Sequence, residues 1–431
     1  MKITVVGAGY VGLVTAVCLA KIGHNVICVD IQEDKIKKLN DGCATIFEPK
    51  LEELMQKNKN RLQYTTDGRN AYKEAEVIFI GVGTPEKKDG SANLKYVYSV
   101  AKDIAESIEN DTVIVIKSTV PIGTNEKMER FIKNNLKKNV KVEVVSNPEF
   151  LSQGTAINDT LNAQRIVLGV ESENAKKIMK LVYDKFERPY IFTDRNSAEM
   201  IKYASNDFLA LRISYINEIA NLCEFVGANI EDVAKGMGMD ERIGNKFLKA
   251  GIGYGGSCFP KDTKALHWLA EFNDYELKTV KATIEVNRNQ KIKLIKKARK
   301  YYESFEGITV AILGLTFKPN TDDLREAPAL DNIPILIEDG ANIKVFDPVG
   351  EENLKSIFHN EIEYCNSIKD TLVDADICFI FTDWEIIRNI DMNLFIELMK
   401  KPIIVDGRNC FQLDKIPNGL IYDSIGRKTI K

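Results

Sequence analysis

Short runs of consecutive apolar residues alternate along the chain with longer segments in which apolar residues recur every three or four positions. The first run, Lys-Ile-Thr-Val-Val at 2–6, is apolar except for Lys2 and Thr4; a helical segment follows over 11–22, and a second run covers 25–29 and is apolar after Asn25. Apolar runs of this length are typical of strands buried on both faces of a parallel sheet. The pattern therefore predicts a strand–helix–strand unit at the start of the chain.

This alternation occurs in the first and in the last part of the chain, and the residues between them have helical spacing. We expect Ser197 to be the N-cap of a long helix from about Glu199 to Val226. A further helix is expected within 231–256, and a lysine-rich helical connector over 268–302. The other expected strands are 76–80, 112–116, 141–145, 165–170 and 190–193 in the first part, and 309–314, 342–346, 375–381 and 402–405 in the last.

The pattern predicts two Rossmann-like, doubly wound α/β domains joined by a central all-α domain that contains the long helix. We place these domains at 1–196, 197–302 and 303–431. At ~1.5 Å per residue the long helix spans about 40 Å, enough to bridge domains or to form a dimer contact. The last domain lacks the glycine pattern of the first, so it could bind a mononucleotide or be purely structural.

Composition and charge narrow the class of protein. The net charge of -3 predicts neither a nucleic-acid partner nor an anionic membrane surface. No apolar run is long enough to span a bilayer, and Met1 leads directly into the first strand without a secretory signal pattern. The eight cysteines are scattered without C-x-x-C spacing and the three histidines form no cluster, so we expect no metal site. A cytoplasmic location fits these features.

A dinucleotide site is predicted at the first strand–helix turn, where the glycines follow the GxGxxG pattern. Gly7 is expected to make the tight turn, Gly9 to let the backbone approach a pyrophosphate, and Gly12 to pack the helix against the strand. The helix N-terminus supplies N–H groups for the phosphates. Asp30 ends the second strand, where its carboxylate can bind the ribose hydroxyls and would repel a 2′-phosphate, which favours NAD over NADP. The alternative is a glycine-rich turn with no ligand.

Small or polar residues follow three further strands of the first domain. They are Thr84, Ser118 with Thr119, and Glu149. Because ligands bind at the carboxyl ends of strands in doubly wound sheets, we expect these side chains to line one crevice. Each residue alone could serve only to form a turn.

Cys258 lies in a glycine-rich loop, and Pro260 follows it where a helix could begin. A thiol at that position faces the positive end of the helix dipole, which favours the thiolate. Asp262 lies one turn into the same helix. We interpret Cys258 as a nucleophile; the alternative is a buried cysteine beside a tight turn.

Two polar residues of the long helix, Lys202 and Asn206, are four positions apart and therefore neighbours on one face. From the helix alone, a solvated polar face is the favoured interpretation. The cations Arg242, Lys246 and Lys249 precede the cysteine loop, which is able to admit a diphosphate.

Seven motifs in order along nearly the whole chain resemble the UDP-glucose 6-dehydrogenase family of sugar-nucleotide dehydrogenases. The stretch around Cys258 is the most specific of them. The motifs are GAGYVGL at 7–13, KSTVP at 117–121, SNPEFL at 146–151, Lys202 with Asn206, MDERIGNKFLKAGIGYGGSCFPKD at 239–262, GLTFKPNTDDLRE at 314–326 and DGR at 406–408.

The resemblance implies oxidation of a sugar C6 alcohol to a carboxylate with two NAD and one water. It also implies a homodimer formed through the central helix and a last domain that binds the UDP moiety. The implied catalytic residues are Cys258 as nucleophile, with Lys202, Asn206, Asp262, Thr119 and Glu149 around the reacting oxygen and a water.

The resemblance also implies binding residues in all three predicted domains. Arg242 would reach across from the partner subunit, and Ser257 would help to bind the substrate. For NAD the implied residues are Gly7, Gly9, Tyr10, Val11, Gly12, Asp30, Lys35, Thr84, Ser118, Thr119, Gln153, Lys261 and Arg325. For the substrate they are Glu149, Phe150, Leu151, Ser152, Gln153, Lys202, Asn206, Arg242, Lys249, Gly253, Tyr254, Gly255, Phe317, Lys318 and Arg408.

Two positions bear on the choice of substrate and cofactor contacts. Many family members have a glutamate where this chain has Gln153, a position expected near the cofactor. Relatives acting on N-acetylated sugars usually resemble GGHC at the cysteine, whereas this chain reads GGSC, which favours UDP-glucose; GDP-mannose dehydrogenases can also carry GGSC.

Two different functions also stay open from the sequence. One is that of a two-electron hydroxyacid dehydrogenase, which has no use for a nucleophilic thiol. The second is that of a non-catalytic sensor of NAD or nucleotide sugar.

Overall fold

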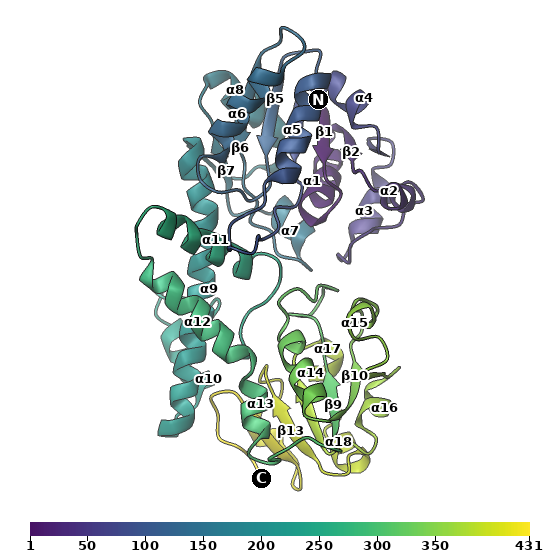
Figure 1. The fold of residues 1–431 in the computed structure, drawn as a ribbon, viewed down its shortest axis with the longest axis vertical. Coiled ribbons are helices and arrows are strands. Elements are labelled where there is room, and N and C mark those ends of the chain that lie inside the picture. Colours follow the sequence, from purple (N-terminus) through teal and green to yellow (C-terminus); the bar gives the residue numbers. More distant parts are fainter. The chain divides into compact units, whose positions relative to one another are not determined.

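The computed structural model describes residues 1–431, which form two compact units, Met1–Ser205 and Asn206–Lys431 (Figure 1). The first unit contains strands and helices in alternation. They are β1 (Lys2–Val6), α1 (Tyr10–Lys21), β2 (Asn25–Val29), α2 (Glu33–Asn40), α3 (Leu51–Lys57), β3 (Leu62–Thr65), α4 (Gly68–Lys73), β4 (Val77–Ile80), α5 (Lys95–Ser107), β5 (Thr112–Ile116), α6 (Thr124–Asn135), β6 (Val142–Ser146), α7 (Ala156–Leu161), β7 (Ile166–Gly169), α8 (Glu173–Tyr183) and β8 (Tyr190–Thr193).

The sheet of the first unit has eight strands in the order β3-β2-β1-β4-β5-β6-β7-β8. Strands β1 to β6 are parallel to one another, and their order is that of a dinucleotide-binding sheet. Strand β7 runs antiparallel to β6, and β8 is parallel to β7. The strand order reverses between β1 and β4, so the loops after these two strands border the crevice in which such sheets bind ligands.

Alternate residues of the central strands pack into different apolar clusters. Val77 and Phe79 of β4 pack into a cluster with the apolar residues of α1, whereas Ile78 and Ile80 pack with residues of α5 and α6. Both faces of the sheet are therefore covered, which explains why the sequence shows continuous apolar runs rather than alternation.

The long central helix is α9 (Arg195–Val226), and it begins four residues before the expected start at Glu199. The prediction that Ser197 is the N-cap is wrong, because Ser197 lies inside the first turn. Its backbone N–H and its hydroxyl both donate to the Asp194 carboxylate, at 2.8 and 2.6 Å. Asp194 can start the helix because it precedes Arg195 and its side chain accepts the Ser197 N–H, one of the orphan N–H groups of the first turn.

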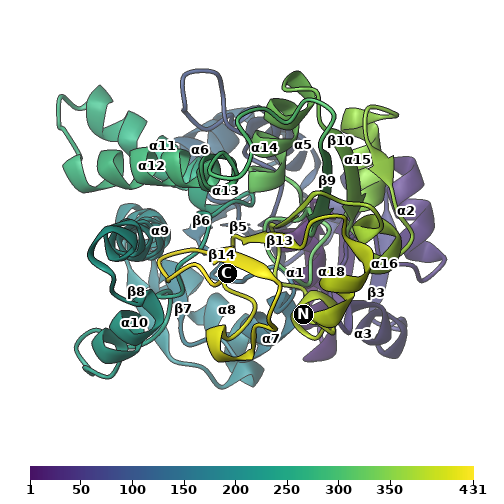
Figure 2. The same ribbon diagram turned by 90° about the horizontal axis from the view of Figure 1, so that it is seen from below.

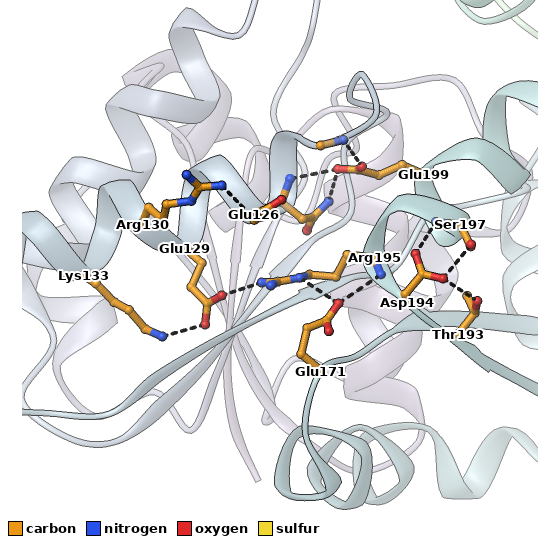
Figure 3. A network of polar contacts seen from close by, with 12 residues as sticks. Glu126, Glu129, Arg130, Lys133, Glu171, Thr193, Asp194, Arg195, Ser197 and Glu199 are labelled. Atoms are coloured by element: carbon orange, nitrogen blue, oxygen red, sulfur yellow. Dashed lines mark hydrogen bonds and ion pairs between the residues drawn. The ribbon is translucent and has the colours of Figure 1, made fainter.

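Charged residues near its start fix α9 to α6 of the first unit (Figure 3). Arg195 Nη1 lies 2.7 Å from Glu129 Oε2. The buried Glu199 carboxylate accepts from the backbone N–H of Gly123 at 2.5 Å and from the backbone N–H of Asn125 at 2.8 Å. These bonds satisfy N–H groups that the first turn of α6 leaves unpaired.

The second unit begins within α9 and contains a helical part and a second sheet. Its remaining elements are α10 (Ile230–Gly238), α11 (Phe259–Phe272), α12 (Lys278–Lys291), α13 (Lys293–Ala298), β9 (Thr309–Leu313), α14 (Pro328–Glu338), β10 (Asn342–Phe346), α15 (Glu351–Phe358), β11 (Glu363–Tyr364), α16 (Ile368–Leu372), β12 (Ile377–Ile380), α17 (Glu385–Arg388), α18 (Asn393–Leu398), β13 (Ile403–Asp406) and β14 (Ile421–Ser424).

The second sheet has six parallel strands in the order β11-β10-β9-β12-β13-β14, which repeats the arrangement of the first six strands of the other sheet. Helices α11 and α12 pack side by side in the helical part (Figure 2). No helix is both long enough and apolar enough to cross a membrane.

A Rossmann-like sheet in each unit, with the long helix α9 between the two sheets in the sequence, confirms the predicted fold class. Strands β3, β11 and β14 were not among the expected strands, and within 231–256 only the start is helical. The division into domains at 1–196, 197–302 and 303–431 stays a prediction.

Candidate active site

The turn between β1 and α1 is shaped by the three predicted glycines. Gly7 has φ +100, and a Cβ on Gly12 would lie 1.7 Å from the Gly7 carbonyl oxygen, so only glycine fits at Gly12. A Cβ on Gly9 would meet nothing within 4 Å, which leaves open space over the start of α1. A cradle of this kind, at a helix N-terminus, fits the pyrophosphate of a dinucleotide.

Asp30 is held beside this turn at the end of β2. Its carboxylate accepts from the backbone N–H of Ala8 at 2.8 Å and of Gln32 at 3.1 Å. Lys35 Nζ lies 3.4 Å from Asp30 Oδ2. The structure thus brings together Asp30, the predicted ribose ligand, and Lys35, which was predicted to bind the cofactor. Tyr10, another predicted cofactor ligand, donates its hydroxyl to the Phe47 carbonyl at 2.5 Å.

The loops after β4 and β5 are tied to each other. The Thr84 hydroxyl donates to the Thr119 carbonyl at 2.8 Å, and the Ser118 hydroxyl donates to the Val82 carbonyl at 2.6 Å. Thr84 and Ser118 are buried. Since β4, β5 and β6 are neighbours in the sheet, the loops that carry Thr84, Thr119 and Glu149 follow adjacent strands, as predicted.

Glu149 forms a buried ion pair with Lys202 of α9. Lys202 Nζ lies 2.8 Å from Glu149 Oε1, and the two side chains are only 3% and 5% exposed. The Phe150 ring covers the pair, with its centroid 5.5 Å from Lys202 Nζ. The burial of Lys202 excludes the solvated polar face that the helix alone favoured.

The loop after Glu149 is held by carboxylate side chains that accept hydrogen bonds from its backbone. The Leu151 N–H donates to Glu149 Oε2 at 2.7 Å, and the Ser152 N–H donates to Asp159 at 3.0 Å. Gln153 follows in the same loop and is partly exposed.

A second lysine, Lys117, lies near enough to the ion pair to feel the charges of Glu149 and Lys202, and it was not among the predicted site residues. Lys117 Nζ donates to Asn147 Oδ1 at 3.1 Å. Burial lowers the pKa of Lys117 to about 8, while the nearby Glu149 charge acts in the opposite direction. Its position in the KSTVP motif was the signal available in the sequence.

Cys258 is the N-cap residue of α11, and Pro260 lies in the first turn, as the sequence predicted. The Cys258 side chain is partly exposed, and its Sγ lies 3.7 Å from the Ser257 hydroxyl. A thiol at the start of this 14-residue helix lies where the helix dipole favours the thiolate.

Asp262 of α11 is bonded to the second polar residue of α9. Asn206 Nδ2 donates to Asp262 Oδ2 at 2.7 Å, and Lys261 Nζ lies 2.5 Å from Asp262 Oδ1. Both Asn206 and Asp262 are buried. We call these three residues the Asp262 cluster: Asn206, Lys261 and Asp262.

Buried amide side chains hold the glycine-rich loop before Cys258, and sequence reasoning missed all of them. Asn287 of α12 accepts from the Tyr254 N–H at 2.8 Å and donates to the Tyr254 carbonyl at 3.1 Å. Asn217 accepts from the Gly251 N–H at 2.8 Å, and Gln290 donates to the Gly251 carbonyl at 2.6 Å. No spacing in the sequence links these amides to the loop.

The loop before Cys258 also packs against the loop that follows β9. The Gly256 N–H donates to the Arg325 carbonyl at 2.7 Å. A Cβ on Gly255 would lie 2.4 Å from the Glu326 carbonyl oxygen and 2.9 Å from the Phe317 Cβ. Gly255 therefore permits a close backbone approach that another residue would prevent.

Arg408 connects three segments through their backbone. Its guanidinium donates to the carbonyls of Phe381 at 2.8 Å, Gly253 at 3.1 Å and Phe317 at 3.1 Å. The structure therefore places Arg408 beside Gly253 and Phe317, which the family resemblance groups with it as substrate ligands.

The other predicted cations have local partners. Lys249 Nζ lies 2.7 Å from Asp383, and Lys318 Nζ lies 5.5 Å from the Phe317 ring centroid. The guanidinium of Arg325 pairs with Asp323 at 2.6 Å. The Arg242 side chain is 89% exposed and pairs with Asp240, two residues away.

The predicted catalytic residues fall into two groups, one in each unit. Thr119, Glu149 and Lys202 belong to 1–205, whereas Cys258 and the Asp262 cluster belong to 206–431. Helix α9 carries Lys202 and Asn206 one turn apart and so contributes to both groups. The structure contains no group of three or more histidine, cysteine, aspartate or glutamate side chains that could hold a metal ion.

Three segments of the chain match the domain profiles of one protein family, the UDP-glucose/GDP-mannose dehydrogenase family. Residues 1–187 match its NAD binding domain, 196–289 its central domain and 311–413 its UDP binding domain. A UDP-glucose 6-dehydrogenase of Bacillus subtilis (strain 168) is 48% identical over 433 residues, covering 100% of this chain and 98% of the relative.

The solved structures similar to this chain include two sugar-nucleotide dehydrogenases. The structure of a UDP-glucose dehydrogenase from the hyperthermophilic archaeon Pyrobaculum islandicum superposes with a TM-score of 0.93 at 34% identity, covering 99% of this chain and 98% of the other. A UDP-D-ManNAc dehydrogenase from Pyrococcus horikoshii superposes with a TM-score of 0.87 at 28% identity, covering 99% of both chains.

Proposed function

Because the chain belongs to the UDP-glucose/GDP-mannose dehydrogenase family, we propose that it oxidises the C6 alcohol of UDP-glucose to the carboxylate of UDP-glucuronate, with NAD as the electron acceptor. The names of the relatives support this substrate, since a relative 48% identical over the full chain is a UDP-glucose 6-dehydrogenase. The observation that carries the proposal is the partly exposed Cys258 at the start of α11, directly after a glycine-rich loop.

Cys258 accounts for the oxidation of an alcohol by four electrons. The first oxidation converts the C6 alcohol into an aldehyde, which cannot lose a second hydride until a nucleophile adds to its carbon. The Cys258 thiolate adds to form a thiohemiacetal, and removal of the second hydride gives a thioester. Water then cleaves the thioester, which releases the carboxylate and restores the thiolate. NAD supplies the acceptor for both hydrides, so each sugar consumes two NAD and one water and yields three protons.

The Glu149–Lys202 pair supplies charge next to the reacting oxygen in this mechanism. Glu149 stabilises the buried ammonium of Lys202, which then donates to the C6 oxygen as negative charge develops there. Asn206, one turn further along α9, adds a neutral donor. Removing a single donor of this kind typically costs ~3 kcal/mol of transition-state stabilisation.

Hydrolysis of the thioester requires a positioned water and a group that accepts its proton. Glu149 and Asp262 are the two carboxylates that the proposal assigns to this step, with Thr119 as a further ligand of the water. Glu149 accepts hydrogen bonds from Lys202 and from the Leu151 N–H, which fix its orientation.

The turn after β1 is the proposed NAD site. In this proposal the pyrophosphate lies over Gly9, where a Cβ would meet nothing within 4 Å, while Gly7 and Gly12 shape the turn. Asp30, whose carboxylate accepts from the Ala8 N–H at 2.8 Å, would bind the ribose. The further NAD ligands implied by the resemblance, from Lys35 to Arg325, and the substrate ligands from Glu149 to Arg408, remain part of this proposal.

The family resemblance and one face of α9 support a homodimer. Phe208, Tyr215 and Leu222 recur every seven residues along α9, and each is about half exposed. The stripe continues to Phe225, which is 86% exposed. Apolar residues at this spacing lie on one face of a helix, and pairing that face with a second copy would remove it from water. Arg242 would then reach the partner's substrate.

A cytoplasmic location is part of the proposal, because NAD and nucleotide sugars are substrates of that compartment. All eight cysteines are free thiols, which fits a reducing environment.

The proposal is tested by offering UDP-glucose, GDP-mannose and UDP-N-acetylmannosamine separately with NAD and counting NADH per sugar. We expect two NADH per UDP-glucose and little or no turnover of the other two. One NADH per sugar would exclude the four-electron reaction, and preference for another sugar would exclude UDP-glucose as the substrate. No NADH with any of the three would favour the non-catalytic sensor.

A further inference from the structure

Asp207 is a buried acidic residue that the proposed mechanism does not use. It follows Asn206 on α9 and is only 5% exposed. Neither carboxylate oxygen, Oδ1 or Oδ2, has a hydrogen-bond partner. Buried ionised carboxylates are almost always paired or hydrogen-bonded, because burial of an uncompensated charge is very costly.

Two other titratable groups are coupled to Asp207, and both belong to segments packed against this part of α9. One is Asp262 near the start of α11, whose charge acts on Asp207. The other is Tyr254 of the glycine-rich loop; burial raises its pKa above the usual range, and the Asp207 charge acts in the same direction. Thr263 of α11 contributes a neutral hydroxyl bonded to Tyr254. No cation is among the groups that shift the pKa of Asp207.

The partners of the two carboxyl groups decide which of them carries the charge. Asp262 accepts from Asn206 at 2.7 Å and pairs with Lys261 at 2.5 Å, so a donor and a cation face its carboxylate. Asp207 has neither kind of partner. Burial, and then the Asp262 charge, raise the pKa of Asp207 to about 8. Asp207 is therefore the neutral member of the pair at pH 7, as one carboxyl of two in a shared site commonly is.

We propose that Asp207 is a positioning residue whose protonated side chain keeps the adjacent Asp262 cluster in its working arrangement. The inference rests on the proposed dehydrogenase function, in which Asn206 and Asp262 act beside the reacting carbon. When Asp207 ionises, its proton passes to solvent and no covalent bond changes. The new charge repels Asp262 inside a buried site, so the cluster must rearrange or Asp262 must take up a proton.

The kinetic consequence is that kcat falls at alkaline pH because Asp207 loses its proton. A group that titrates near pH 8 is about one tenth ionised at pH 7 and about nine tenths ionised at pH 9. If the ionised form is inactive, kcat falls about tenfold between these two pH values for this reason alone. Other groups also titrate in this range, so the comparison must be made against a variant that cannot ionise at this position.

The test compares the pH profiles of kcat for the full-length wild type, Asp207→Asn and the control Asp274→Asn. Asparagine has the shape of a protonated aspartate and no titrating proton. Asp274 is exposed and has φ +54, a conformation that asparagine adopts as readily as aspartate. We expect the ratio of Asp207→Asn to wild-type kcat to be constant between pH 6 and 7 and to rise about tenfold by pH 9. The ratio for the control is expected to stay flat.

Each outcome decides the question. Parallel profiles for Asp207→Asn and wild type would overturn the inference, and so would an Asp207→Asn protein that fails to fold, because a neutral carboxyl should tolerate its amide. If neither protein oxidises UDP-glucose, the proposed function fails instead. Urea unfolding then still tests the protonation: the difference in midpoint between Asp207→Asn and wild type should grow from pH 5 to pH 7, and a constant difference would overturn the inference.

Discussion

The protonation of Asp207 leads to a prediction about stability that can be worked out in magnitude. Its carboxyl has an ordinary pKa of 3.8, and burial with the Asp262 charge raises this to about 8 in the folded protein. Between these pH values the unfolded chain has lost the proton and the folded chain keeps it. Folded wild type therefore loses stability as pH rises through this window, because the unfolded state binds fewer protons.

The slope follows from linkage. Each pH unit inside the window costs ~1.36 kcal/mol for a single group, so the change from pH 5 to pH 7 is about 2.7 kcal/mol. Asp207→Asn has no proton to lose at this position and is free of this cost. The amide can also change the free energy of unfolding by an amount that is the same at both pH values. The test therefore uses only the increase, from pH 5 to pH 7, in the difference in unfolding free energy between Asp207→Asn and wild type.

Tryptophan fluorescence during urea unfolding measures the stability of the unit that contains Asp207. The chain has only two tryptophans, Trp268 and Trp384, and both lie in 206–431 together with Asp207. For an m-value of about 3 kcal/mol/M, the midpoint of Asp207→Asn should gain about 1 M over wild type between pH 5 and pH 7. The control Asp274→Asn should gain nothing. A difference that stays constant, or that shrinks as pH rises, would refute the assignment of a neutral Asp207.

Four further predictions concern the site itself. Cys258→Ser should lower the rate of NADH production at least ~10³-fold while NAD affinity, measured by titration calorimetry, stays within error of wild type. Lys202→Met should lower kcat about 10²- to 10³-fold and, since it leaves Glu149 buried without its partner, destabilise 1–205 by about 3–5 kcal/mol, as read by hydrogen exchange. Gly255→Ala should displace the cysteine loop and cost about 1–3 kcal/mol in urea unfolding, with a slower alkylation of the thiol. Asn287→Ala should cost a similar amount, about 1–3 kcal/mol, because two backbone groups of the loop lose their partner; full activity and stability in this variant would contradict the role given to that amide.

The sequence predicted the elements whose signal is local. The turn around Gly7 and the start of α11, with Pro260 in its first turn, are determined by residues within a few positions of one another, and both are confirmed. The start of α9 was placed too late, because Ser197 and Asp194 are both good N-cap residues and only the three-dimensional structure distinguishes them.

The rest of the site depends on contacts between residues far apart in the chain. The burial of Lys202 arises from its pairing with Glu149, and a helix pattern alone suggested a solvated face instead. Asn287 and Asn217 reach the loop before Cys258 from α12 and α9, at separations that no motif records. The charge state of Asp207 likewise depends on the absence of hydrogen-bond partners for its oxygens, which only the folded structure reveals.

The central claim, that Cys258 holds the half-oxidised sugar, is tested most directly by mass spectrometry of the quenched enzyme. In Glu149→Gln the proposed hydrolytic carboxylate is removed, so the acyl group should accumulate when UDP-glucose and NAD are supplied. We predict that the peptide containing Cys258 gains the mass of a UDP-glucuronyl thioester, and that the gain requires both substrates. Turnover of wild type to two NADH per sugar without any adduct on Cys258 in either protein, or with the adduct on another residue, would contradict the account.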